Sequence, residues 1–509
     1  MLKIFHKIFS KSKNTADDYL FQGIVEKQRG EYKLAIKLFT KSIELKPINE
    51  LAYYERAVAY VEGLQEYSRA ISDFNKAIEI NPIFTDAYSE RGLLYSKTLL
   101  DYNKAIIDFD KVLEINPTNV EVYNNRGISY CQIQNYSKAI SDFSISIELN
   151  PTNAETYNNR GISYYSINEY SKAISDYSEA IKVKPNYGEA YKNRAILYET
   201  LEDYNNALID YTKAIEITPN DAILFYKRGK IFEDLKDFRR AVLDYDRAIE
   251  IEPKMVKAYL LRCIIYGMVL KDWEKAITDC NTLIKLNQNK EQAYFIRGTS
   301  NFYLHNYSKS ISDFTKVIEI NKVYVDAYVG KGMAYFCLEE YSKAISDFAK
   351  AIEINPNHEE AYKNRALAYI ALKDSLKSIL DLTKAIEISP SNGALYNYRG
   401  EIYFELKKWS NSESDYTKAI ELNPNDYTLY YRRGIIYYHL KQYPKGIIDF
   451  NKAIELNPNY ADAYYARGLL YYGLYFGLDT EKACNDWRIA YSLGHLGAKE
   501  QLDKYCKIE

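Results

Sequence analysis

Asparagine side chains recur at a spacing of 34 residues in three consecutive stretches of the sequence, where they could hold a bound peptide. The row consists of Asn124, Asn125, Asn158, Asn159, Lys192 and Asn193. Asn364 takes the place of Asn125 in a later stretch. A side-chain amide offers both a donor and an acceptor, so such a row could grip the backbone of an extended peptide whatever its sequence. The alternative is that N-N-R-G is a habitual filler whose asparagines are solvated, and both interpretations are kept.

Apolar residues occupy the same region of the repeated stretches farther along the chain. This set, which we call the apolar strip, consists of Leu260, Leu261, Phe295, Ile296, Phe302, Val329 and Phe336. An exposed strip of this kind would suit a partner helix or an apolar peptide. Alternatively, neighbouring helices or a second copy of the chain bury it.

An arginine and an aspartate recur together along nearly the whole chain. Of fourteen repeated stretches, twelve carry the arginine, such as Arg126, and one carries Lys331 instead. Thirteen carry the aspartate, such as Asp142. The one stretch without the cation, which has Gln22, also lacks the anion, so the pattern predicts a partly buried ion pair inside each repeat. A catalytic carboxylate would not recur so often, and this pair is therefore expected to be structural.

No residue pattern for catalysis or metal binding emerges from the sequence. The five histidines are scattered, and His358 lacks the second histidine of a zinc-protease helix. The six cysteines form no C-x-x-C pair, so we expect reduced thiols in a cytoplasmic protein. No glycine-rich phosphate loop occurs. The sequence therefore predicts a protein that is not an enzyme and that uses no cofactor or metal.

Charge and hydropathy restrict the class of partner. The chain has 67 basic and 69 acidic residues, which argues against a nucleic-acid ligand because binding phosphates needs a basic surface. No apolar run is long enough to span a membrane. Residues 1–13 form a basic leader, for which we consider either disorder or a short amphipathic helix in weak peripheral contact with an anionic membrane.

The elements that position these residues follow from a repeat. Eleven of the twelve prolines stand in register, at gaps of 34 or 35 residues apart from one gap of 103. Each stretch opens with a leading aromatic, such as Tyr157, and a small residue follows four positions later, ten times a glycine such as Gly161. Spacings of three and four place side chains on one helix face. Each repeat is therefore predicted to be two antiparallel helices, and the glycines predict close approach between them, since glycine in a helix costs about 1 kcal/mol relative to alanine.

The motif Y-x-x-R-G-x-x-Y, followed by A-x-x-D-F and a proline, resembles the tetratricopeptide repeat family, as in YNNRGISY at residues 123–130. The resemblance implies an all-α solenoid of about 14 helix-turn-helix hairpins in a right-handed superhelix, with the first helices on the concave side. It covers residues 14–494, and residues 495–509 are expected to form a capping helix and tail. One extra residue is expected between the helices around Gly63, Thr98 and Val269, and three more near residues 473–480.

The resemblance also implies a function. Arrays of this kind are non-enzymatic scaffolds that hold a peptide or partner protein in the concave groove, and the asparagine row is similar to the ladder in the O-linked N-acetylglucosamine transferases. The alternative is a self-associating or membrane-apposed structural array that is anchored through the basic leader.

Overall fold

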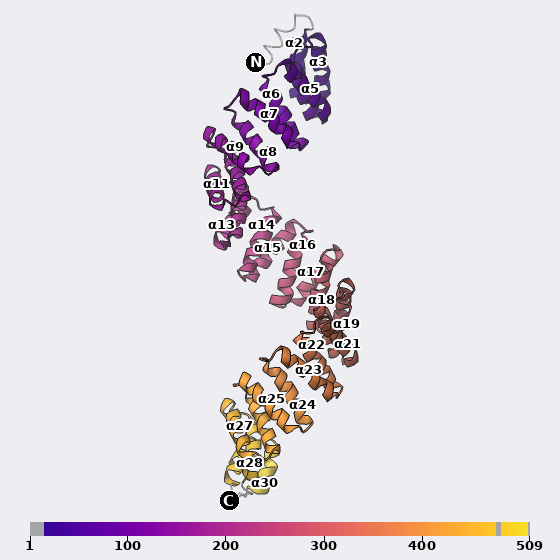
Figure 1. The fold of residues 1–509 in the computed structure, drawn as a ribbon, viewed down its shortest axis with the longest axis vertical. Coiled ribbons are helices and arrows are strands. Elements are labelled where there is room, and N and C mark those ends of the chain that lie inside the picture. The colour runs from indigo at the N-terminus through magenta and orange to yellow at the C-terminus, as the bar shows by residue number, and fades with distance from the viewer. Residues whose placement is uncertain (1–14, 475–479, 507–509) are drawn as a thin grey trace. The chain divides into compact units, whose positions relative to one another are not determined.

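The protein is entirely helical over the residues that the computed structural model describes, 15–474 and 480–506. They contain 29 α-helices, three π-helical turns and no strand (Figure 1). The basic leader and most of the predicted insertion near residues 473–480 lie outside the described residues. The helices fall into two units, Met1–Pro253 and Lys254–Glu509, which are described separately.

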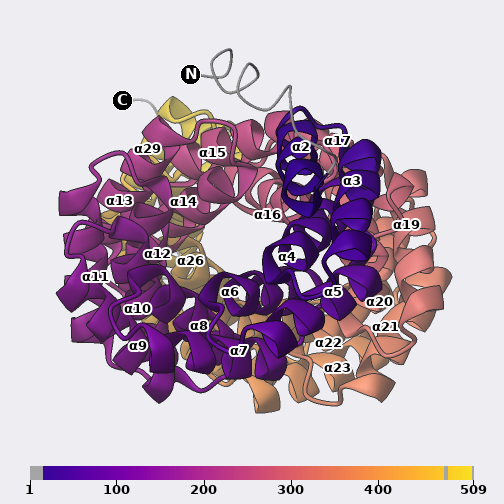
Figure 2. The ribbon, with the colours of Figure 1, turned by 90° about the horizontal axis from the view of Figure 1, so that it is seen from above.

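The first unit contains seven helical hairpins in sequence. Its helices are α2 (Ala16–Gln28), α3 (Tyr32–Leu45), α4 (Glu50–Ala59), α5 (Tyr67–Ile80), α6 (Thr85–Leu93), α7 (Tyr102–Ile115), α8 (Val120–Gln132), α9 (Tyr136–Leu149), α10 (Ala154–Ser166), α11 (Tyr170–Val183), α12 (Gly188–Thr200), α13 (Tyr204–Ile217), α14 (Ala222–Asp234) and α15 (Phe238–Ile251). Within this unit the even-numbered first helices α4, α6, α8, α12 and α14 lie on the inner side of the curve, and the odd-numbered second helices lie outside (Figure 2).

The second unit contains seven further hairpins and one additional helix. Its helices are α16 (Val256–Ile264), α17 (Trp273–Lys285), α18 (Lys290–Tyr303), α19 (Tyr307–Ile320), α20 (Val325–Cys337), α21 (Tyr341–Ile354), α22 (Glu359–Ala371), α23 (Ser375–Ile388), α24 (Gly393–Glu405), α25 (Trp409–Leu422), α26 (Tyr427–His439), α27 (Tyr443–Leu456), α28 (Ala461–Leu474), α29 (Thr480–Ser492) and α30 (Gly497–Tyr505). Here too α20 and α22 lie inside α21 and α23 (Figure 2).

Turn residues separate the helices in the way that the sequence suggests. Between α8 and α9 the backbone passes through one left-handed residue, Gln134, with φ of 60°. Asn135 then caps α9, because its side chain accepts a hydrogen bond from the backbone N–H of Lys138. At the far end, Asn150 ends α9 directly before Pro151, which cannot continue the helix.

Three first helices end in a π-helical turn. These turns are η1 (Tyr60–Leu64), η2 (Leu94–Thr98) and η3 (Ile265–Leu270). They hold Gly63, Thr98 and Val269, so the extra residue is not between the helices, as the sequence predicts, but inside the last turn of the first helix. A π turn spans one residue more than an α turn, and it therefore absorbs the insertion without moving the start of the second helix.

The predicted close approach between the two helices of a hairpin is confirmed. All ten glycines that follow a leading aromatic by four residues face an aromatic ring on the second helix. A Cβ atom at Gly161 would lie 2.7 Å from Cε1 of Tyr177, and one at Gly127 would lie 2.6 Å from Cε1 of Phe143. Both rings are buried, so these glycines provide the space that the rings fill.

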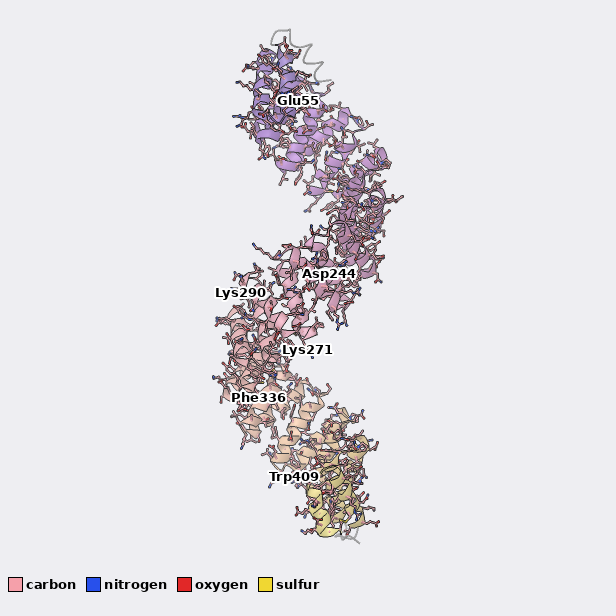
Figure 3. The ribbon with its side chains drawn as sticks, turned by 180° about the vertical axis from the view of Figure 1, so that it is seen from behind. Glu55, Asp244, Lys271, Lys290, Phe336 and Trp409 are labelled. Carbon is pink, nitrogen blue, oxygen red and sulfur yellow. A yellow bond between two sulfur atoms is a disulfide. The ribbon has the colours of Figure 1, made fainter. Side chains whose placement is uncertain are left out.

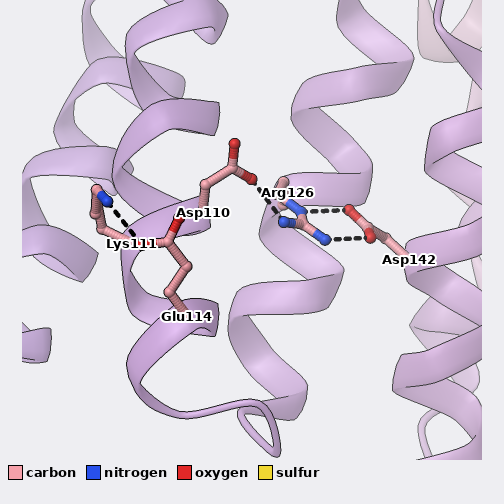
Figure 4. Close-up of polar contacts among 5 residues, drawn as sticks. All are labelled: Asp110, Lys111, Glu114, Arg126 and Asp142. Atoms are coloured by element: carbon pink, nitrogen blue, oxygen red, sulfur yellow. Dashed lines mark hydrogen bonds and ion pairs between the residues drawn. The ribbon is translucent and has the colours of Figure 1, made fainter.

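The predicted ion pair is present in thirteen hairpins. In twelve of them the arginine forms two parallel hydrogen bonds to the aspartate of its own second helix, as between Arg126 and Asp142 at 2.6 and 2.7 Å. Lys331 makes one contact of 3.2 Å with Asp347. In at least ten hairpins the arginine also bonds to the second helix of the preceding hairpin, as Arg126 does to Asp110 at 2.6 Å (Figure 4). Each such arginine therefore joins three helices.

Burial opposes the charge of both partners of this pair. It raises the pKa of Asp142, although the hydrogen bonds from Arg126 counteract this effect. Burial lowers the pKa of Arg126, but the hydrogen bonds to Asp142 and Asp110 outweigh it and leave this pKa above its ordinary value. The pair is consequently costly to break, because either partner alone would be a buried charge.

The expectation that all cysteines are reduced is wrong for two of them. Cys484 of α29 and Cys506 form a disulfide with Cα atoms 5.7 Å apart. The reason is that α30 folds back onto the last hairpin, where the ring of Tyr505 lies 4.4 Å from that of Tyr472. Cys131, Cys263, Cys280 and Cys337 are free thiols.

We expect Gly161→Leu to destabilise the first unit by about 1–3 kcal/mol, because the leucine would overlap the ring of Tyr177. Urea unfolding followed by circular dichroism measures this change. Ser166→Leu, which places leucine at an exposed site on the same helix, is the matched control and should change stability by less than about 0.5 kcal/mol. Equal effects of the two substitutions would contradict the packing role of Gly161.

We expect Asp142→Ala to cost about 3–5 kcal/mol, since it removes the buried partner of Arg126 and leaves that guanidinium with only the more exposed carboxylate of Asp110. In a stacked array this loss should be local, so hydrogen exchange should accelerate in α8 and α9. Glu179→Ala removes the exposed pair of Glu179 with Lys182, which are 3.1 Å apart, and should cost about 1 kcal/mol or less. A small effect of Asp142→Ala would show that this pair is dispensable.

Candidate functional site

The asparagine row lies on three consecutive first helices of the first unit. Asn124 and Asn125 are on α8, Asn158 and Asn159 are on α10, and Lys192 and Asn193 are on α12. These are inner helices of their hairpins (Figure 2). The structure therefore brings all six residues to neighbouring elements on one side of the unit.

Half of these side chains hold neighbouring first helices together. Nδ2 of Asn193 donates to Oδ1 of Asn158 at 2.9 Å, and Asn158 is only 2% exposed. Oδ1 of Asn124 accepts a hydrogen bond from the Thr156 hydroxyl at 3.3 Å. These three amides are thus engaged within the chain, and α8, α10 and α12 are joined through them.

Lys192 points toward the next hairpin. Its Nζ lies 3.7 Å from the carboxylate of Asp221, the residue that caps the N-terminus of α14. The lysine therefore balances the charge of a capping carboxylate. Its contact with a ligand stays a prediction.

Asn125 and Asn159 differ from the others. Both side chains are half-buried, and neither amide forms a hydrogen bond within the described part of the chain, where only their backbone carbonyls accept bonds, from Ser129 and Ser163. Two equivalent amides on adjacent helices are thus available to a ligand.

Charged residues extend this row at both ends, and the sequence reasoning missed them. Glu55 on α4 and Glu90 on α6 precede Asn125 at the equivalent position, and Lys227 on α14 follows Asn193. The signal was available, since each of the three stands two residues after a leading aromatic. The row consequently changes from acidic through neutral to basic along the first unit.

The charged members have different surroundings. Glu55 lies 2.5 Å from Nζ of Lys27, and Lys227 lies 3.2 Å from Glu199. Glu90 has no ion-pair partner within residues 15–474 and 480–506. Burial raises the pKa of Glu90, and the nearby carboxylates of Glu62 and Glu121 raise it further. The cations of Lys97 and Lys27 act in the opposite direction, and a cationic group of a ligand beside Glu90 would favour its ionised form further.

The apolar strip lies in the second unit, on α16, α18 and α20. Ile296 and Val329 are 6% and 5% exposed, so they belong to the interior. The other members, Leu260, Leu261, Phe295, Phe302 and Phe336, are half-buried. Several of their rings also pack within the unit, as Phe295 does at 5.1 Å from Tyr324. The strip is therefore divided between packing and partly accessible surface, and its role in binding stays a prediction.

Other kinds of site are not formed by the residues that the structure describes. Within this part of the chain no three side chains of histidine, cysteine, aspartate or glutamate come together as metal ligands. None of its helices combines the length and apolar character needed to cross a bilayer.

Known proteins share the repeat. Family models described as tetratricopeptide repeat match residues 51–84, 85–119, 120–153, 154–187, 188–221, 222–255, 325–358, 359–392, 394–426, 427–460 and 450–496. Among curated proteins none matches the chain.

Solved structures are similar to parts of the chain. The crystal structure of MamA is 29% identical, covering 34% of this chain and 94% of that one with a TM-score of 0.32. That of YrrB, described as a TPR protein with an unusual peptide-binding site, is 23% identical, covering 36% and 95% with a TM-score of 0.32. The C-terminal part of a TPR repeat-containing protein from Cytophaga hutchinsonii is 22% identical, covering 47% and 97% with a TM-score of 0.41.

The helical hairpins, their arginine–aspartate pairs and the matching family models all indicate the same repeat. Because the matched residues make up well over half of the chain, it belongs to the tetratricopeptide repeat family of helical protein-interaction scaffolds.

Proposed function

We propose that the first unit binds an extended segment of a partner protein along the inner side of α8, α10 and α12. Asn125 and Asn159 hydrogen-bond to the peptide backbone. The observation that carries this proposal is that these two equivalent, half-buried amides have no hydrogen-bond partner in the described part of the chain. Both amides are partly exposed, so a peptide backbone can bond to them without breaking a contact within the described part of the chain.

The spacing of the helices suits an extended ligand. Packed helices lie about 8–10 Å apart, and an extended chain advances about 3.3 Å per residue. The two amides would therefore contact peptide groups about three residues apart. Since each amide can donate and accept, this grip does not depend on the side chains of the ligand.

The charge of Glu90 would orient the bound peptide along the row. Glu90 lies on α6, the inner helix before Asn125, and it lacks an ion-pair partner among the described residues. A lysine or arginine of the bound segment would pair with it, and this contact would favour basic residues at the end of the ligand nearest to α6.

The double variant Asn125→Ala/Asn159→Ala tests the proposal. Peptides are first selected from a phage library of random 12-residue sequences with the full-length chain, and one is synthesised for titration. Two lost hydrogen bonds of about 1 kcal/mol each should weaken its binding by about tenfold or more. The melting temperature should stay nearly unchanged, because neither side-chain amide bonds within the described part of the chain.

Asn193→Ala is the matched control for this experiment. It removes an amide from the same row, but that amide bonds to Asn158, so we expect a lower melting temperature. Unchanged peptide affinity in the double variant would contradict the proposal, and so would a loss of stability as large as that caused by Asn193→Ala.

A further inference from the structure

A small cavity lies in the second unit, formed by α20, α21 and α22. Its volume is about 200 Å³, and its lining residues are Met333, Phe336, Cys337, Phe348, Asn364 and Leu367. Phe336, one of the residues of the apolar strip, marks its position on α20 (Figure 3). The cavity is smaller than the range of about 300–1,000 Å³ that is typical of small-molecule sites. It has room for one side chain rather than for a cofactor.

The lining is apolar apart from one amide and one thiol. Phe348 is fully buried, while Met333, Phe336 and Leu367 are half-buried around the opening. A methionine adapts its shape readily to different apolar groups. Cys337 is exposed at the rim. No charged side chain lines the cavity, so its occupant must be uncharged.

Asn364 contributes an unused donor to this cavity. Its Nδ2 is buried and has no hydrogen-bond partner in the described structure. Asn364 stands at the same position of its repeat as Asn193, whose Nδ2 donates to the residue 35 positions earlier, Asn158. The residue 35 positions before Asn364 is Val329, whose side chain cannot accept a hydrogen bond.

We propose that this cavity takes one uncharged apolar side chain, of about the size of leucine, from an extended peptide segment of a partner. Nδ2 of Asn364 donates to a backbone carbonyl of the peptide beside that side chain. This proposal rests on the proposed function of the array, and it adds a second contact region with a stated preference. A peptide fits better than a plain hydrocarbon chain, because only the peptide provides an acceptor for the amide.

Cys337 allows the proposal to be tested on the full-length chain by reversible disulfide exchange. The probes are the symmetrical disulfides of N-acetyl-leucine 2-mercaptoethylamide, of its serine analogue, and of hexanethiol, which lacks a carbonyl. The thiolate of Cys337 attacks one probe sulfur, forms a mixed disulfide with it, and releases the other half of the probe as a thiol. Peptide mapping by mass spectrometry measures the labelling of Cys337 against increasing 2-mercaptoethanol. We expect the leucine probe to withstand about tenfold more 2-mercaptoethanol than the serine probe, which corresponds to about 1.4 kcal/mol. The hexyl probe should fall between them.

Two variants examine the amide. Asn364→Leu removes the donor, and Val329→Asn offers it an acceptor within the chain, as Asn158 does for Asn193. Either substitution should remove the advantage of the leucine probe over the hexyl probe, provided that the melting temperature shows a folded chain. One folded variant is enough to test whether the amide of Asn364 donates to the probe.

Equal labelling by the leucine and serine probes, including no labelling by either, would overturn the proposal. Equal labelling by the leucine and hexyl probes in the unmodified chain would overturn the role of Asn364. These outcomes concern the second unit, whereas the double variant of Asn125 and Asn159 tests the peptide site of the first unit. Failure of this proposal is thus distinct from failure of the proposed function.

Discussion

The arginine that joins three helices is the interaction on which the rest of this structure depends. In at least ten hairpins it binds the aspartate of its own second helix and a polar residue on the second helix of the preceding hairpin, so one side chain fixes both the hairpin and its stacking. Because burial opposes the charge of Asp142, such a pair adds little net stability compared with apolar packing. Its contribution is to fix the register of the packed helices, because a hairpin that shifted along its neighbour would leave buried charges unpaired.

Much of this arrangement could be predicted from the sequence, because each part leaves a periodic trace. The fourteen hairpins follow from the proline spacing, the ion pairs from the one repeat that lacks both the arginine, replaced by Gln22, and the aspartate, and the close packing from glycines such as Gly161. The π turns could be located but not identified, since one extra residue fits a loop or a helix equally well. The disulfide between Cys484 and Cys506 left no trace, because it depends on how α30 folds back.

The candidate site was harder to predict because neighbouring hairpins use one position in different ways. The sequence treats Asn125, Asn159 and Asn193 as equals. In the structure Asn193 bonds to Asn158, whereas Asn125 and Asn159 have no partner in the described part of the chain. Asn159 also has an asparagine 35 positions earlier, Asn124, but Oδ1 of Asn124 accepts from the Thr156 hydroxyl instead. For Asn364 the residue at this position is Val329, which has no acceptor in its side chain. Binding surface in this array is therefore created where a repeat omits a contact that its neighbours make.

The π turns have a consequence for how the array can vary. All three insertions are taken up at the hairpin tips, so the stacked faces keep their spacing while the tip changes in length. That edge is therefore the natural place for this chain to gain residues during evolution, and an epitope or fluorophore could be grafted beside the exposed Val269.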